Sequence, residues 1–259
     1  MQSLINKYGK WALITGASSG IGAEFALQLA ALEFNLVLVA RRKDRLENIS
    51  AELIAKYKIE TLVISLDLST PNFLETIKNQ TNHLDIGLLI NNAGFAITGS
   101  FLNDKLENQL SLLDVNCKAP LVLSHYFGNK MLKKGKGGII NIASTAAFLP
   151  LPYWSNYAAS KAYLLSFSEG IWYELKHNGI DVLAVCPGPT QTEFTSIAKV
   201  NFKGMTANDV VNYSLKNLGK KPSIIVGFAN QFSIFFLRFF SRKILIKFGA
   251  IFTQKIAIN

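Results

Sequence analysis

Cysteine is scarce in this sequence. The chain has two cysteines, Cys117 and Cys186, and both lie in apolar surroundings without the spacing of metal ligands. A disulfide framework is therefore excluded as the basis of the fold, and no metal site is expected. We expect the two thiols to be small core residues of a protein from a reducing compartment.

Long uncharged apolar runs are also absent. The residues before Trp11 lack the apolar core of a secretory signal. The longest uncharged run, 222–237, includes a predicted strand and turn, whereas a membrane-spanning helix needs around 20 apolar residues. We therefore expect a cytoplasmic protein without a membrane-spanning helix.

Acidic residues stop at Asp209, although basic residues continue almost to the end of the chain. Most of the net charge of +10 consequently lies in residues 210–259. In residues 228–259, aromatic and aliphatic side chains are interleaved with Arg and Lys, which suits a helix lying on an anionic membrane surface. A dimer contact and a cover over the substrate pocket are the alternatives. We expect no nucleic-acid partner, because so apolar a segment suits lipid better than phosphate.

The pattern of apolar runs predicts the fold class. Short buried runs alternate with helical segments from Trp11 onward, which indicates an α/β fold with a Rossmann-like, doubly wound parallel sheet. At 259 residues and 49% hydrophobic, the chain is long enough for one sizeable core. We expect a single domain, with residues 1–227 as its dinucleotide-binding and catalytic part. Residues 228–259 are expected to form a helical extension of the same domain.

A serine, a tyrosine and a lysine stand in an order that suits proton transfer to a carbonyl oxygen. Tyr157 and Lys161 are four residues apart, so a helix over 156–174 places them on one face. A nearby lysine charge is expected to lower the pKa of the phenol from its usual value near ~10. Ser144 follows the predicted strand 138–143, which places its hydroxyl at the rim of the sheet. A tyrosine and a lysine at this spacing also occur together by chance, so the rest of the chain must support this interpretation.

A glycine-rich turn follows the first predicted strand. Gly16, Gly20 and Gly22 stand between the apolar run 11–15 and an amphipathic segment at 23–32. Glycines allow the backbone to approach a pyrophosphate, and the N-terminus of a following helix offers free N–H groups. The spacing differs from the Gly-x-Gly-x-x-Gly fingerprint of dinucleotide sites, and a plain tight turn is the alternative.

The second predicted strand ends at two arginines, Arg41 and Arg42. NAD sites usually carry an acid here for the ribose hydroxyls, whereas arginine suits the 2′-phosphate of NADP. We therefore expect NADP(H) rather than NAD(H), with solvated arginines at the start of a helix as the alternative. Asp67 ends the third predicted strand, where it either accepts a hydrogen bond from the adenine amine or caps a turn.

Polar residues also follow the later predicted strands. Asparagines at 91 and 92 can fix neighbouring loops or contact a cofactor. Thr190 and Thr192 follow the turn after the sixth strand and can bind a carboxamide or a phosphate. Residues 193–205 are expected to form a lid over the substrate. Asn116 lies in a predicted helix from about 105 to 133, where a buried structural amide is the alternative to a functional one.

Together these motifs resemble those of the short-chain dehydrogenase/reductase family, in the same order along the chain. The resemblance covers residues 9–227 and is carried by Thr15-Gly16-x-x-x-Gly20-x-Gly22, Asn91-Asn92-Ala93-Gly94, Asn116, Ser144, Tyr157-x-x-x-Lys161 and Pro187-Gly188. The basic residues after Ala40 and in the tail resemble bacterial members near the 3-ketoacyl reductases and hydroxysteroid dehydrogenases. Ser18 departs from the pattern, because many NADP-preferring members carry a basic residue there.

The resemblance implies roles for individual residues. Tyr157 would be the general acid or base, Ser144 would bind the substrate oxygen, Lys161 would bind the nicotinamide ribose, and Asn116 would hold a water in the proton path. The implied cofactor contacts are Gly16, Ser18, Ser19, Gly20, Ile21, Gly22, Arg41, Arg42, Asp67, Asn92, Ala93, Gly94, Tyr157, Lys161, Pro187, Gly188, Thr190 and Thr192.

The expected activity is the reduction of a carbonyl of a small apolar substrate by NADPH, or oxidation of the corresponding alcohol. The expected assembly is a homodimer or homotetramer. The alternative function is a nucleotide-sensing module that binds a membrane or protein without turnover. The complete set of Ser144, Tyr157 and Lys161 argues against that alternative.

Overall fold

A parallel sheet runs through the middle of the protein. The computed structural model describes residues 4–193 and 204–257, so most of the expected lid at 193–205 lies outside the described residues. The strands of the sheet follow the order β3-β2-β1-β4-β5-β6-β7, and every neighbouring pair is parallel. They are β1 (Trp11–Thr15), β2 (Asn35–Ala40), β3 (Thr61–Ser65), β4 (Ile86–Asn91), β5 (Gly137–Ile142), β6 (Ile180–Cys186) and β7 (Ser223–Ile225).

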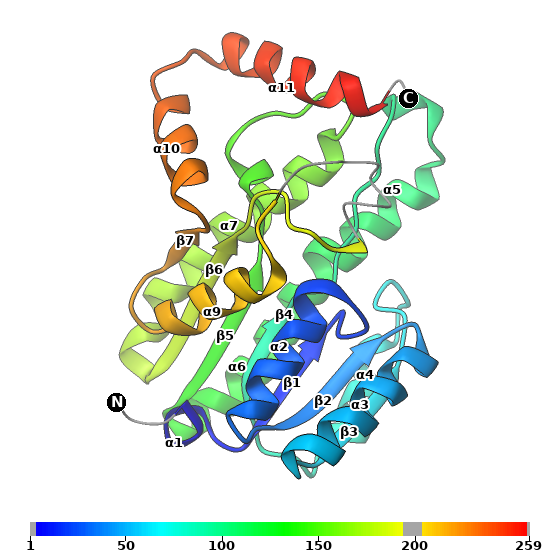
Figure 1. Cartoon of the computed structure of the whole chain (residues 1–259), viewed down its shortest axis with the longest axis vertical. Helices are drawn as coiled ribbons and strands as arrows, with labels where there is room; N and C mark the ends of the chain where they lie inside the picture. Colours follow the sequence, from blue (N-terminus) through cyan, green and yellow to red (C-terminus); the bar gives the residue numbers. More distant parts are fainter. Residues whose placement is uncertain (1–3, 194–203, 258–259) are drawn as a thin grey trace.

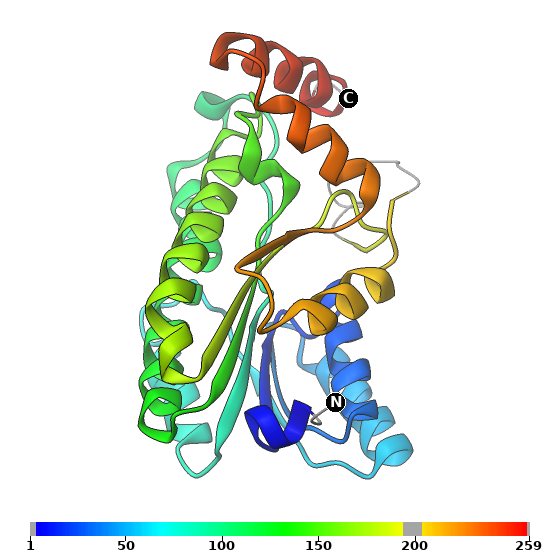
Figure 2. The same cartoon turned by 90° about the vertical axis from the view of Figure 1, so that its left-hand side faces the viewer.

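Helices cover both faces of this sheet, as Figure 2 shows in side view. The helices of the core are α1 (Leu4–Tyr8), α2 (Gly20–Ala31), α3 (Lys43–Tyr57), α4 (Phe73–Thr81), α5 (Leu106–Leu113), α6 (Ala119–Lys134), α7 (Ser155–Leu175) and α9 (Ala207–Asn217). Apolar side chains of α2, α3 and α9 pack on one face, and those of α4, α6 and α7 pack on the other. The predicted doubly wound, Rossmann-like α/β fold is therefore confirmed.

The strands are apolar in both directions because both faces of the sheet are covered. Every residue of β2, β4 and β5 is buried. Successive side chains of a strand point to opposite faces, so Leu13 packs into one core cluster and its neighbour Ile14 into the other. Continuous apolar runs in the sequence are what such two-sided burial requires.

The strand order reverses direction between β1 and β4, because the chain leaves β3 and returns to the other side of β1. Ligands of doubly wound sheets bind outside the carboxyl ends of the strands at such a point. The residues that follow β1 and β4 are the glycine turn and the segment Asn92 to Gly94. The topology therefore places two of the predicted motifs next to each other.

The chain after β7 forms two further helices, α10 (Phe228–Leu237) and α11 (Arg242–Ala257). Both lie beyond the carboxyl ends of the strands, away from the amino-terminal helix α1 (Figure 1). Ile234, Leu245 and Thr253 are buried, which fixes one side of each helix against the rest of the protein. Among the described residues, no helix combines the length and the apolar character needed to cross a bilayer.

Candidate active site

The glycine turn has a backbone shape that requires glycine. Gly16 and Gly20 have φ values of +67° and +57°, in the left-handed region that other residues rarely adopt. A Cβ on Gly22 would overlap the carbonyl oxygen of Gly16, so the first turn of α2 packs directly on the loop before it. The N-terminus of α2 thus stands at the end of β1, where its N–H groups favour an anion.

Residues after β4 hold this turn in place. The Asn92 side chain donates hydrogen bonds to the carbonyl oxygens of Thr15 (2.9 Å) and Gly16 (3.2 Å). In return, the Thr15 hydroxyl accepts from the backbone N–H groups of Asn92 and Ala93, each at 3.0 Å. Of the two roles considered for the asparagines, the structure shows Asn92 in the first, fixing a neighbouring loop.

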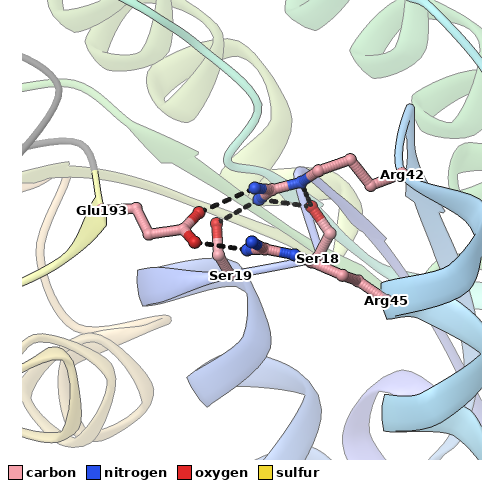
Figure 3. A network of polar contacts seen from close by, with 5 residues as sticks. All are labelled: Ser18, Ser19, Arg42, Arg45 and Glu193. Carbon is pink, nitrogen blue, oxygen red and sulfur yellow. Dashed lines mark hydrogen bonds and ion pairs between the residues drawn. The ribbon is translucent and has the colours of Figure 1, made fainter.

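Arg42 reaches back over the glycine turn and belongs to a network of polar contacts (Figure 3). Its guanidinium donates to the hydroxyls of Ser18 (3.1 Å) and Ser19 (2.8 Å) and to the carboxylate of Glu193 (2.8 Å). Arg45 donates to the other oxygen of the same carboxylate. Hydrogen bonds from Arg45 and then Arg42 lower the pKa of Glu193 to about 2. Glu193 was not among the predicted residues, because nothing in the sequence links it to the arginines.

Arg41, which follows β2, and Asp67, which follows β3, form a second ion pair near this network. The Arg41 side chain is 73% exposed, and its guanidinium is 3.8 Å from the Asp67 carboxylate. Asp67 accepts hydrogen bonds from the backbone N–H (2.9 Å) and hydroxyl (2.8 Å) of Ser69, so it caps a turn. Burial raises the pKa of Asp67, but the Ser69 hydrogen bonds and the Arg41 charge outweigh burial and hold it below its usual value.

The predicted catalytic side chains meet at the carboxyl end of β5. Tyr157 and Lys161 lie on α7, and the Tyr157 phenol hydrogen-bonds the Ser144 side chain, which follows β5. Lys161 Nζ donates to the carbonyl oxygen of Ile142 (2.8 Å) and lies 5.8 Å from the centroid of the Tyr157 ring. The helical spacing therefore brings the phenol and the ammonium together as predicted.

Burial sets the pKa values of this pair. It raises the pKa of Tyr157 to about 12, although the hydrogen bond with Ser144 acts in the opposite direction. It lowers the pKa of Lys161 to about 8. The predicted lowering of the Tyr157 pKa is therefore wrong in direction, because removal of the phenol from water outweighs the hydrogen bond with Ser144.

Asn116 lies beside this group and not in the cavity wall. It belongs to a π-helical segment, Asp114–Lys118, which separates α5 from α6 in what the sequence predicts as one helix. Its amide accepts from the Phe95 N–H (3.1 Å) and donates to the Phe95 carbonyl (3.0 Å) and the Ser160 hydroxyl (3.0 Å). Through these contacts the buried Asn116 side chain fixes the backbone of the segment after β4 next to α7.

The loop after β6 covers the glycine turn. Thr192 is the neighbour that a Cβ on Gly20 would meet, at 3.1 Å. Thr190 donates from its hydroxyl to the carbonyl oxygen of Gly188 (3.0 Å), and a Cβ on Gly188 would overlap the side chain of Asn230 in α10. The loop after β6 thus contacts both the glycine turn and α10.

A single cavity of about 1020 Å³ connects these features. Of the predicted site residues, Gly22 and Asn116 do not line it, whereas the following do: Gly16, Ser18, Ser19, Gly20, Ile21, Arg41, Arg42, Asp67, Asn92, Ala93, Gly94, Ser144, Tyr157, Lys161, Pro187, Gly188, Thr190 and Thr192. A crevice with a glycine turn, a helix N-terminus and arginines at one end and a buried phenol at the other fits a dinucleotide.

The tail also contributes to this cavity, which corresponds to one of the three roles considered for it. Ile234 and Leu237 of α10 and Phe248 of α11 line the wall together with Leu149 and Leu151. The excess of apolar residues in the tail was the available signal, but the sequence did not show which of them turn inward. The two cysteines are free thiols, and burial raises the pKa of both.

Comparisons with known proteins agree with this geometry. The model of the short chain dehydrogenase family matches residues 10–201. The very-long-chain 3-oxoacyl-CoA reductase of Scheffersomyces stipitis is 33% identical over 226 residues, which are 83% of this chain and 65% of that protein. The chain therefore spans less than two thirds of the length of that relative.

Two solved structures are similar over most of their length. A 7β-hydroxysteroid dehydrogenase superposes with a TM-score of 0.89 at 27% identity, covering 96% of this chain and 100% of the other. A short-chain dehydrogenase from Sphingobium yanoikuyae in complex with NADPH gives a TM-score of 0.78 at 34% identity, covering 83% and 86%. The protein therefore belongs to the short chain dehydrogenase family.

Proposed function

We propose that this protein is an NADP(H)-dependent oxidoreductase that reduces the carbonyl of an apolar substrate, or oxidises the corresponding alcohol, with Tyr157 as the general acid or base. The observation that supports this most strongly is the single cavity shared by the Tyr157 phenol, the glycine turn and Arg42. The proposed proton donor and the proposed cofactor site thereby share one cavity. Relatives named as 3-oxoacyl-CoA reductase and hydroxysteroid dehydrogenase act on carbonyl or alcohol groups, which is consistent with the proposal.

In this proposal the nicotinamide, when bound, supplies or accepts the hydride. With a pKa of about 12, the Tyr157 phenol is protonated at neutral pH and can donate its proton to the substrate oxygen. Ser144, which already hydrogen-bonds the phenol, holds that oxygen beside it. With a pKa of about 8, Lys161 is mostly protonated at neutral pH, and its charge stabilises the negative charge that develops on the oxygen or the phenol.

The preference for NADP(H) rests on the arginines after β2. Arg42 is held over the glycine turn by Ser18 and Ser19, and its neighbour Arg41 has an exposed side chain 3.8 Å from Asp67. A 2′-phosphate between them would gain two positive neighbours. Equal use of NADH and NADPH, measured as kcat/KM with one ketone, would remove this part of the proposal.

The test of the proton role is Tyr157→Phe. Loss of the phenolic O–H is expected to reduce kcat by roughly a hundredfold to ten-thousandfold, the usual contribution of general acid–base catalysis, while NADPH still binds. The matched control is Tyr163→Phe on the same helix, since the Tyr163 ring stacks on Phe167 and does not line the cavity. Unchanged turnover in Tyr157→Phe would contradict the role. NADPH binding without oxidation across a panel of carbonyl compounds would favour the nucleotide-sensing alternative.

We also propose that the protein is a cytoplasmic homodimer or homotetramer. Leu121 and Leu132 are 40% and 44% exposed on α6 and give apolar surface for such a contact. Light scattering on the purified full-length chain would show the assembly, and a monomer at micromolar concentration would contradict it.

A further inference from the structure

The first tail helix, α10, presents a stripe of phenylalanines to solvent. Phe228, Phe232 and Phe235 follow at intervals of four and three residues, so they lie on one side of the helix, and Phe239 continues the stripe just beyond its end. These four side chains are 82%, 57%, 53% and 72% exposed. The rings of Phe235 and Phe239 contact each other, with centroids 5.6 Å apart, and Phe236 contacts both Phe232 (4.5 Å) and Phe235 (5.7 Å). An exposed contiguous aromatic patch of this kind marks a site of interaction.

The opposite side of the same helix faces the cavity. The residues of α10 that line it are Asn230, Ser233, Ile234 and Leu237, which also repeat at helical spacing. Along the chain these residues alternate with the phenylalanines of the stripe, and they lie about half a turn around the helix axis from them. The helix is thus a thin wall, with the substrate space on one side and exposed phenylalanines on the other.

The second tail helix, α11, repeats this division. Leu245, Gly249 and Thr253 are buried on its inner side, and a Cβ on Gly249 would overlap the carbonyl oxygen of Pro150. Ile244 and Ile251 are 41% and 62% exposed on the other side. Lys243 and Lys247 accompany them and are exposed too. Long lysine side chains beside apolar residues can extend to the lipid headgroups while the apolar groups enter the boundary below them.

The charge of this region has one sign. Arg238, Arg242, Lys243 and Lys247 are exposed on and between the tail helices, and no Asp or Glu follows Asp209 in the sequence. A protein partner with an apolar surface would not require an uninterrupted positive charge. An anionic bilayer attracts such a surface and buries its aromatic side chains, each of the two effects adding to the other.

From these observations we propose that α10 and α11 dock on the surface of an anionic lipid bilayer, and that the cavity takes lipophilic ketones or alcohols from it. The second part of this proposal rests on the proposed oxidoreductase function, and the first does not. Phe228, Phe232, Phe235 and Phe239 enter the headgroup boundary, while the basic side chains contact anionic headgroups. The cavity then lies behind one helix, about 10 Å from the lipid. An apolar substrate from the bilayer then has only a short distance to travel to the cavity that contains Tyr157.

Vesicle flotation of the full-length protein tests the docking. We expect it to bind phosphatidylglycerol/phosphatidylcholine vesicles and to bind pure phosphatidylcholine at least tenfold more weakly, with binding that decreases as salt increases. The double substitution Phe228→Ala/Phe239→Ala should weaken binding to anionic vesicles by roughly tenfold or more, since each side chain loses its buried ring. Lys243→Gln/Lys247→Gln should weaken it by a similar factor and flatten the salt dependence.

Matched variants remove the same groups elsewhere on the surface. Tyr173→Ala deletes an aromatic ring that is 64% exposed on α7, and Lys56→Gln/Lys133→Gln removes two charges at the ends of α3 and α6. Both should bind vesicles like the unmodified protein. Equal loss in these controls, or no vesicle binding at all, would overturn the docking. So would a tail variant that changes the oligomeric state while vesicle binding stays the same, since the patch would then be a contact between copies of this chain.

Kinetics separate the docking from the oxidoreductase activity. With a water-soluble ketone, Phe228→Ala/Phe239→Ala should keep the kcat and KM of the unmodified protein, because neither residue lines the cavity. With a lipophilic ketone carried in anionic vesicles, its kcat/KM should fall roughly in parallel with vesicle binding, by about tenfold. An equal kcat/KM for both forms on the vesicle-borne ketone would overturn delivery from the bilayer. Absence of turnover with every ketone would contradict the proposed function, while flotation would still decide the docking.

Discussion

Tyr157 and Lys161 are both buried in the cavity wall, and burial favours the neutral form of each. The pKa of the phenol is raised to about 12 and that of the ammonium is lowered to about 8. Lys161 therefore loses its proton at a lower pH than Tyr157, the proposed proton donor. The group that limits carbonyl reduction at alkaline pH is expected to be the lysine.

The pH profile of carbonyl reduction should show this order. We expect kcat/KM to be level near neutral pH and to decrease above about pH 8, because deprotonation of Lys161 removes the positive charge beside the reacting oxygen. Stopped-flow or steady-state measurement of NADPH oxidation across this range checks the prediction. A profile that stays level up to the titration of the phenol would contradict it.

Glu193 accepts a hydrogen bond from Arg42 and would therefore compete for this arginine with the 2′-phosphate of the proposed cofactor. Glu193→Gln removes the negative charge and keeps the shape, so we expect the KM for NADPH to fall by about twofold to fivefold, as for loss of one exposed ion pair. The KM for NADH should change less, because NADH lacks the 2′-phosphate. Glu52→Gln on the exposed side of α3 changes the net charge equally and should leave both constants unaltered. A rise in the NADPH KM would show instead that the carboxylate positions the arginine.

These residues show what was predictable at the residue scale. The meeting of Tyr157 and Lys161 follows from helical spacing, which is local in the sequence. The contact between Arg42 and Glu193 joins positions 151 residues apart, and it depends on how two loops meet. The pKa of Tyr157 was predicted in the wrong direction because the extent of burial is a property of the packed structure.

Among the contacts between secondary-structure elements, the close packing of α2 on the glycine turn leaves no room for a side chain at Gly22. Gly22→Ala places a Cβ against the carbonyl oxygen of Gly16 and the amide of Asn92, so the turn has to move. We expect the KM for NADPH to rise by roughly tenfold or more and the thermal midpoint to fall, at a cost of about 1–3 kcal/mol for overpacking. Thermal unfolding and coenzyme titration measure the two effects.

Gly170→Ala on α7 is the matched control for that substitution. A Cβ there meets nothing within 4 Å, and alanine is the better helix former. The variant should be more stable by roughly 0.5–1 kcal/mol and should bind NADPH normally. If both variants lost coenzyme affinity, the loss at Gly22 would not come from the packing of α2 on its turn.

The strands were predictable because each is a short, continuous apolar run, and the helices were expected in the longer segments between these runs. The predicted strand 36–40 and helix 156–174 agree with β2 and α7 to within a residue. The π-helical segment at Asp114–Lys118 was missed, although Pro120 follows it in the first turn of α6 and cannot donate a backbone hydrogen bond to the preceding turn. The division of the tail into α10 and α11 was also missed: aromatic and aliphatic residues continue from one helix into the next, and the residues between them, Arg238 to Ser241, include neither glycine nor proline.

In the molecule as a whole, the carboxyl end of the sheet and the tail together form the wall of the cavity. Phe248→Ala removes a ring from the cavity wall, and we expect the KM for a bulky apolar ketone to rise by roughly tenfold, as burial of the ring against the substrate is lost. The KM for NADPH should not change, because Phe248 belongs to the tail, where its ring packs on that of Phe240 with centroids 5.6 Å apart. Coenzyme and ketone titrations on the same preparation provide the measurement, and parallel changes in both constants would contradict it.

The contact between Gly188 and Asn230 has a consequence for recombining this protein with its relatives. Asn230 occupies the space that any larger residue at position 188 would fill, so the two positions have to be exchanged together. In a chimera that receives residues 228–259 alone, α10 has to pack on the loop after β6 of the recipient protein, which was not selected to fit Asn230. A transferred segment that begins at Cys186 contains both Gly188 and Asn230. We expect this longer segment to transfer substrate preference together with the tail.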